Sequence, residues 1–106
     1  MRPRVRVISV EETIRELRSL LSESFPHTTF EIGHSKTFRS TSLTVVWRGG
    51  PHAREVQAIT APRQGMRFYP ASNRRRRITT VIINPTGVRE RVSYEPAFVS
   101  LHRLQG

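Results

Sequence analysis

The sequence predicts one α+β domain, in which an antiparallel sheet carries two helices on one face. Three observations predict this class. Several segments alternate apolar with polar residues, as half-buried strands do, and two others space their apolar residues as helices do. Their order along the chain is that of the ferredoxin-like, or split βαβ, plan with an appended C-terminal β-hairpin. A length of 106 residues suits one hydrophobic core, so a single domain is expected over residues 1–106.

The N-terminal part predicts a strand followed by a helix. Charged and apolar residues alternate from Arg4 to Ile8, which is typical of a half-buried strand with arginines on its solvent side. Ser9 lies three residues before Glu12, the spacing of a capping box, and apolar residues then recur at helical intervals. The helix is expected from Val10 to Ser24, because Pro26 disfavours a helical backbone at the residue before it.

Two further strands and a short helix are expected in the middle of the chain. β-Branched and aromatic residues predict a strand from Thr28 to Ile32, with Gly33 to Ser40 as the turn that follows it. The alternation from Ser42 to Trp47 is the strongest strand signal and predicts a central strand. Pro51 is expected at the first position of a short helix that ends before Pro62.

The C-terminal part combines short strands with a basic loop. Met66 to Tyr69 is expected as a brief strand, and Pro70 to Arg77 as an exposed, arginine-rich loop. A basic hairpin is expected from Ile78 to Tyr94, because the proline and glycine within Asn84 to Gly87 suit a tight reversal. Alternation from Phe98 to Leu104 indicates a final edge strand, so a monomer or a small homo-oligomer is expected.

Positive charge is the main clue to function. Seventeen arginines and Lys36 stand against eight glutamates, for a formal net charge of +10. Residues 56–106 hold nine arginines and two glutamates, so this half carries most of the excess. The planar, permanently charged guanidinium group suits phosphate and carboxylate groups, which favours a polyanionic partner. A GC-rich genome would raise arginine usage equally well without any function.

The candidate binding site is a set of eight arginines in the second half of the chain. Six of them lie between residues 63 and 77 with no acidic residue among them, and two follow on the predicted hairpin. Such a cluster can neutralise several phosphates, and binding would then weaken steeply as salt rises. The alternative interpretation is a solvated loop that binds nothing. The eight residues are Arg63, Arg67, Arg74, Arg75, Arg76, Arg77, Arg89 and Arg91.

Aromatic residues add little to this interpretation. Phe68, Tyr69 and Tyr94 lie near arginines in the sequence, which is a weak sign of base stacking. Phe30 and Trp47 fall on strand faces with other apolar residues, so these two are expected in the core.

The sequence lacks the common catalytic and metal-binding patterns. It has no cysteine and no aspartate, its four histidines are scattered, and no phosphate-binding glycine motif occurs. A non-catalytic protein without a metal or another cofactor is therefore expected. A small ribonuclease toxin is an alternative, in which His34 would act beside Glu31. His52 and Glu55 are the other possible pair.

A series of short motifs runs from Ile14 to Phe68. In order, they are Phe25-Pro26, Thr29-Phe30-Glu31-Ile32, Leu43-Thr44-Val45-Val46-Trp47, and Gly50-Pro51 with Val56 and Ile59 behind it. Over this range the chain resembles the large polyvalent protein-associated domains, small modules in long multifunctional proteins of phages and conjugative elements. The resemblance implies an origin in a mobile element and an accessory role in establishing the element or countering host defence. It implies no catalytic residues.

The first hypothesis is thus a non-catalytic accessory protein of a phage or mobile genetic element, which binds DNA or RNA phosphates through the arginine cluster. The second is a counter-defence inhibitor, of the anti-CRISPR or anti-restriction type, whose arginines bind an acidic surface of a host defence complex. A cytoplasmic location without membrane contact is expected, since neither a signal-peptide pattern nor a run of about 18 apolar residues is found.

Overall fold

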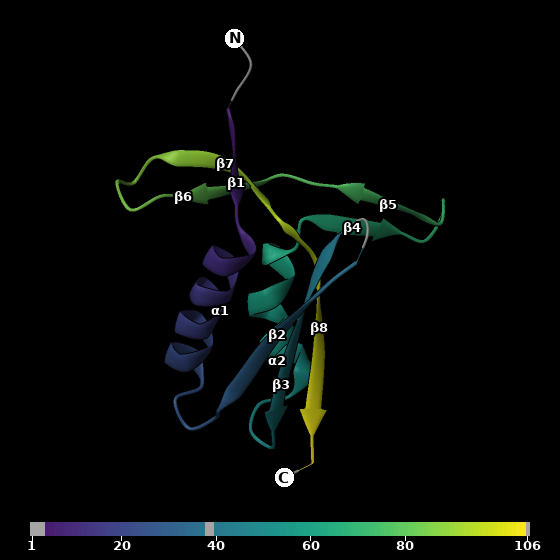
Figure 1. The fold of residues 1–106 in the computed structure, drawn as a ribbon. Helices are drawn as coiled ribbons and strands as arrows, with labels where there is room; N and C mark the ends of the chain where they lie inside the picture. Colours follow the sequence, from purple (N-terminus) through teal and green to yellow (C-terminus); the bar gives the residue numbers. More distant parts are fainter. Residues whose placement is uncertain (1–3, 38–39, 106) are drawn as a thin grey trace.

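The computed structural model describes residues 4–37 and 40–105 as an α+β domain with two α-helices and eight strands (Figure 1). In chain order the elements are β1 (Val5–Ile8), α1 (Val10–Ser24), β2 (Phe30–Lys36), β3 (Thr41–Arg48), α2 (Ala53–Thr60), a 3-10 turn η1 (Ala61–Arg63), β4 (Met66–Tyr69), β5 (Arg74–Arg77), β6 (Thr80–Ile83), β7 (Arg89–Tyr94) and β8 (Pro96–Leu104). The strands form three sheets, in the orders β2-β3-β8, β1-β7-β6 and β4-β5.

The main layer is a three-stranded sheet with both helices on one face. Its central strand is β3, which pairs antiparallel with β2 and parallel with β8. Leu43, Val45 and Trp47 alternate along β3 and so point to the same side, into a core that both helices close. The α+β class, the central strand and the placement of both helices on one face are confirmed. The buried side chains of this core are Val10, Leu17, Leu21, Leu43, Val45, Trp47, Val56 and Val99.

Local signals set the start of each helix. The Ser9 hydroxyl accepts a hydrogen bond from the backbone N–H of Glu12 at 3.1 Å, so the Ser9 half of the predicted capping box is present and α1 spans the predicted residues. The Glu12 carboxylate accepts instead from the Arg6 guanidinium. The N-cap of α2 is His52, so Pro51 lies before the helix and not at its first position. The Pro51 carbonyl instead accepts a 2.9 Å hydrogen bond from the Trp47 indole. Neither helix of the described residues is long and apolar enough to cross a membrane.

A second, smaller sheet lies across one end of the molecule. In it β7 is central, parallel to β1 and antiparallel to β6. One face of this sheet is buried through Ile8 and Val92. The Arg6 guanidinium bonds to the Glu90 carboxylate at 3.0 and 3.1 Å and to the Glu12 carboxylate at 3.3 Å. Arg6 therefore connects the small sheet to the first turn of α1.

The third sheet is a ribbon of two antiparallel strands, β4 and β5, that projects from the body. Met66 pairs with Arg77 at its base and Tyr69 with Arg74 at its tip, where residues 70–73 turn. Figure 1 shows this ribbon and the β6–β7 hairpin leaving the same end of the molecule in opposite directions. The Cα radius of gyration, 14.7 Å, accordingly exceeds the roughly 13 Å of a compact chain of this length.

Strand pairing corrects the predicted sheet. Each three-stranded sheet contains one parallel pair, so the expectation of an antiparallel sheet is wrong, and the ferredoxin-like order is not confirmed. The predicted loop at Arg74 to Arg77 is strand β5, because its backbone pairs with β4, although all four side chains are exposed. The final strand lies at the edge of the main sheet, as expected.

The end of β2 and the burial of β1 also differ from prediction. β2 continues through Lys36, so the turn expected from Gly33 to Ser40 begins too early; residues 38 and 39 lie outside the described residues. The first strand is not half-buried, because Ile8 is its one buried residue. Its valines lie on a face of the small sheet that nothing within the described chain covers.

The passage from β7 to β8, at residues 94–96, connects the sheets. The backbone N–H of Gly65, just before β4, donates to the Pro96 carbonyl at 2.8 Å. The Glu95 carboxylate accepts a 2.9 Å hydrogen bond from the backbone N–H of Val10 at the start of α1. The base of the ribbon and the start of the first helix therefore meet at this junction.

Gly65 has no room for a side chain at this crossing. A Cβ atom built there would overlap the carbonyl oxygen of Tyr94 and the guanidinium group of Arg77. Because the first of these atoms belongs to the backbone, it cannot move aside without shifting the strand. The ribbon can cross the junction this closely only with glycine at position 65.

We therefore expect Gly65→Ala to lower the free energy of unfolding by about 2–3 kcal/mol, measured by urea denaturation. Gly33→Ala is the matched control, because a Cβ atom at Gly33 would meet nothing within 4 Å. The control should change the free energy of unfolding by less than about 1 kcal/mol. Equal losses in the two variants would contradict the close crossing at Gly65.

Candidate nucleic-acid interface

The four-arginine run forms one strand of the ribbon, which has two different faces. Residues paired directly across antiparallel strands share a face, and successive residues alternate between faces. Arg67 pairs with Arg76, and Tyr69 pairs with Arg74. These four side chains therefore lie on one face, and all four are exposed. We call this group, Arg67, Tyr69, Arg74 and Arg76, the cationic face.

The arginines of the cationic face are free of ion pairs within residues 4–37 and 40–105. The three ion pairs found there use Arg6 and Arg63 as their cations. Adjacent like charges repel one another, so such a face is favourable when it is solvated or when it meets negative charge. The cationic face is thus available to a polyanionic partner.

The opposite face of the ribbon contacts the body of the protein. The Arg75 guanidinium lies 5.6 Å from the centroid of the Phe98 ring on β8, within cation–π range. Arg77 donates from Nη1 to the Tyr94 carbonyl at 2.7 Å and from Nη2 to the Glu95 carbonyl at 3.1 Å. These two arginines help to set the direction in which the ribbon projects.

Arg63, at the end of η1, is an internal link between the two helical segments. Its Nε donates to the Glu16 carboxylate on α1 at 2.8 Å, and its Nη1 donates to the Ile59 carbonyl on α2 at 2.6 Å. The side chain is 22% exposed. Its charge is already paired, so Arg63 contributes to packing and not to the cationic face.

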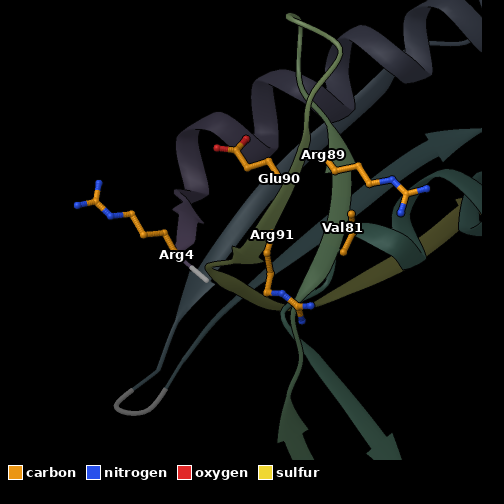
Figure 2. Close-up of a pocket in the computed structure, with 5 residues that line it drawn as sticks. All are labelled: Arg4, Val81, Arg89, Glu90 and Arg91. Carbon is orange, nitrogen blue, oxygen red and sulfur yellow. The ribbon is translucent and has the colours of Figure 1, made fainter. Parts of the chain in front are cut away.

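Arg89 and Arg91 lie on the other hairpin, on β7. The hollow that they line, about 470 Å³ in volume, has Arg4, Val81 and Glu90 as its other walls (Figure 2). Arg91 also donates from Nη1 to the Thr79 hydroxyl at 3.1 Å, and Thr79 lines a second hollow together with Arg67. Arg91 therefore adjoins the base of the cationic face, whereas Arg89 lies further along β7.

The eight predicted site residues fall into four groups in the structure. Three lie together on the cationic face and a fourth lies near its base. Three others are engaged within the protein, and one lies apart on the second hairpin. In this order they are Arg67, Arg74 and Arg76; Arg91; Arg63, Arg75 and Arg77; and Arg89.

The aromatic residues named in the sequence analysis have three kinds of surroundings. Phe68 pairs with Arg75 on the opposite face of the ribbon and is 46% exposed. Tyr69 lies on the cationic face and is 38% exposed, whereas Tyr94 is buried and unable to stack on a base. Phe30 and Trp47 pack in the core with ring centroids 5.6 Å apart, as predicted. Sequence reasoning missed the grouping of Tyr69 with the arginines. The signal for it was the turn at residues 70–73, because a hairpin around this turn pairs Tyr69 with Arg74.

The histidines considered for a ribonuclease have separate surroundings. His34 and Glu31 are three residues apart on β2, so they point to opposite faces of the sheet. The Glu55 carboxylate accepts a 2.8 Å hydrogen bond from the backbone N–H of His52 and caps the start of α2. Among the residues that the structure covers, no three histidine or glutamate side chains are grouped to hold a metal ion.

The chain is a small, basic α+β domain from which two hairpins project, one with a cationic face. A family model described as large polyvalent protein associated domain 29 matches residues 8–105, and the chain belongs to this family. Membership associates the protein with phages and other mobile genetic elements. The match extends beyond the resemblance from Ile14 to Phe68, so the basic half is part of the family domain. No curated protein and no solved structure matches the chain.

The division between engaged and free arginines is testable on neighbouring residues of β5. We expect Arg77→Ala to lower the free energy of unfolding by about 1–2 kcal/mol, because two carbonyl groups lose a charged donor. Arg76→Ala removes an arginine side chain from the cationic face and should change the free energy of unfolding by less than about 0.5 kcal/mol. Thermal unfolding of both variants measures the difference, and a larger loss for Arg76→Ala would overturn the assignment.

Buried Tyr94 should make the protein less stable in alkali. Burial, with a contribution from the charge of Glu16, raises the pKa of Tyr94 above the ordinary value of 10.0. The unfolded chain therefore releases this proton first, and stability falls as the pH rises above about 10. We expect the thermal midpoint of the wild type to fall more steeply above that pH than the midpoint of Tyr94→Phe. Parallel curves for the two proteins would disprove this.

Proposed function

We propose that this protein is a non-catalytic, nucleic-acid-binding accessory protein of a phage or mobile genetic element. The cationic face carries the proposal, because Arg67, Arg74 and Arg76 are exposed side by side with Tyr69 on a projecting ribbon. No glutamate in the described part of the chain forms an ion pair with them. Membership of the family supports the association with a mobile element.

The dimensions of the ribbon suit a groove of duplex DNA. Each strand has four residues and spans about 13 Å, and the two strands lie about 5 Å apart. The major groove of B-form DNA is about 12 Å wide and admits a two-stranded β-ribbon. Guanidinium groups along the ribbon would then reach phosphates. Because phosphate contacts position a protein without reading bases, a low sequence preference is expected.

The rest of the molecule strengthens attraction to a polyanion. A formal net charge of +10 draws negatively charged partners from a distance and speeds their association. Arg91, at the base of the cationic face, extends the positive surface toward the small sheet. On a single strand, the exposed Tyr69 ring offers a platform on which an unpaired base can stack.

The proposal is tested with the triple variant Arg67→Gln/Arg74→Gln/Arg76→Gln. Each phosphate contact on duplex DNA contributes about −0.9 to the slope of log K against log salt, so loss of three contacts should make the slope less negative by about 3. Fluorescence anisotropy of a labelled DNA duplex over a salt series measures both the affinity and the slope. A labelled single-stranded RNA in the same series shows which nucleic acid is preferred.

The matched control is Arg15→Gln/Arg18→Gln/Arg54→Gln, which removes the same charge from exposed positions on the two helices. This control should keep most of the affinity and nearly the whole salt slope. Equal losses in both triple variants would mean that net charge alone drives binding. Unchanged binding by the ribbon variant would reject the cationic face as the binding site.

A counter-defence inhibitor, of the anti-CRISPR or anti-restriction type, is the second candidate. It is favoured by exposed aliphatic side chains, among them Ile83 at 72% exposure, which phosphate binding does not require. Such an inhibitor would bind a host protein complex tightly and bare nucleic acid weakly. Weak binding of both probes by the wild type would therefore favour it, and intact RNA after the titration would argue against a ribonuclease.

A further inference from the structure

The small sheet has an exposed face on which aliphatic residues flank arginines. On its central strand, Arg91 lies between Val5 of β1 and Val81 of β6. Two residues earlier on β7, Arg89 lies beside Ile83 of β6. Val7, two residues after Val5, shares this face. We call it the aliphatic face, defined by Val5, Val7, Val81, Ile83, Arg89 and Arg91.

The aliphatic side chains of this face are largely open to solvent. Val5 is 42% exposed, Val7 60%, Val81 53% and Ile83 72%. Ile8, Val92 and Tyr94 are buried on the reverse face of the same sheet. The exposed aliphatic residues therefore all lie on the one side of the sheet that the described chain leaves open. Single exposed aliphatic residues are common, but a group on one sheet face is typical of a surface that binds a partner.

The charge on the aliphatic face has one sign. Figure 2 shows Glu90 directed away from the side on which Val81, Arg89 and Arg91 lie. The Glu90 carboxylate is moreover bonded to Arg6 at 3.0 and 3.1 Å. A partner would therefore meet guanidinium groups in the middle of the face and aliphatic side chains on either side of them.

Other occupants fit this surface poorly. In a symmetric dimer the same patch would meet its own copy, so the arginines of both copies would enter one interface to which this face brings no carboxylate. Nucleic acid offers phosphates to the arginines but little to four aliphatic side chains. A membrane surface is disfavoured because the face has no aromatic residue or leucine to enter the headgroup layer.

We infer that the aliphatic face binds an acidic segment of a partner protein. Carboxylates of that segment would pair with Arg89 and Arg91, and its apolar side chains would cover the valines and Ile83. Arginine is enriched at protein interfaces and often supplies much of their binding energy when apolar neighbours exclude water. The four residues of the cationic face take no part in this binding, so it does not depend on nucleic-acid binding by the ribbon.

The inference is tested with a library of random peptides displayed on phage and selected on the immobilised protein. The same library is selected in parallel on Val7→Thr/Val81→Thr/Ile83→Thr, which keeps β-branched residues on the strands. Leu104→Thr is the control, because Leu104 is an exposed aliphatic residue, 43% exposed, on β8. Circular dichroism verifies that each variant is folded.

We expect the wild type and Leu104→Thr to enrich peptides that combine carboxylates with aliphatic residues. Synthetic copies of these peptides should bind the threonine triple variant, Val7→Thr/Val81→Thr/Ile83→Thr, at least about tenfold more weakly, because three apolar contacts are lost. Arg89→Gln/Arg91→Gln should also weaken their binding, whereas the ribbon variant should not. Because Arg67→Gln/Arg74→Gln/Arg76→Gln should still bind the peptides, failure of this inference can be told apart from failure of the proposed nucleic-acid binding.

Several results would overturn the inference. They include no enrichment, enrichment of peptides without carboxylates, and equal binding of the selected peptides by the triple variant. Sedimentation of the wild type as a dimer that the triple variant abolishes would make the face an interface between two copies. Binding to anionic phosphatidylserine vesicles that is lost in the triple variant, without selection of acidic peptides, would make it a lipid-binding face.

Discussion

The fold depends on the short backbone segment where β7 passes into β8. The Pro96 carbonyl accepts a hydrogen bond from the Gly65 backbone N–H, and the Tyr94 carbonyl accepts one from the Arg77 guanidinium. The Glu95 carboxylate accepts from the Val10 backbone N–H at the start of α1. The Glu95 backbone N–H donates in turn to the Ile8 carbonyl at 2.9 Å. The ribbon, the first helix and the first strand are thus all hydrogen-bonded to the same three residues, 94–96. Because this segment lies between the two projecting hairpins, it helps to fix their directions.

The arginines of the second half divide according to the groups that this arrangement brings near them. Arg63 meets a carboxylate, Arg77 meets carbonyls, and Arg75 lies over an aromatic ring. Arg67, Arg74 and Arg76 alternate to the opposite side of the ribbon, where the described residues form no ion pair with them. Some of the positive charge therefore stabilises the ribbon, and the remainder is left on a face that can meet phosphate. The two roles depend on each other, since a loosely held ribbon would not present its arginines in a fixed pattern.

The two projecting arms differ in surface chemistry. The cationic face of the ribbon presents three arginines with the Tyr69 ring, which suits phosphates and bases. The small sheet presents aliphatic side chains around two arginines, which suits a protein with carboxylates among apolar residues. Because the arms leave the body in opposite directions (Figure 1), the two proposed binding surfaces lie on different sides of the molecule.

Sequence periodicity by itself determined both helices, the central strand with Leu43, Val45 and Trp47, and the β6–β7 hairpin, because each depends on neighbouring residues. It also located the arginine cluster. Only the tertiary structure decided that residues 74–77 form a strand, which arginines are engaged, and that Val81 is exposed while Val92 is buried. Alternation shows that a strand has two faces, but distant segments determine which face is covered and which strands are parallel. Those pairings are not encoded in any local pattern.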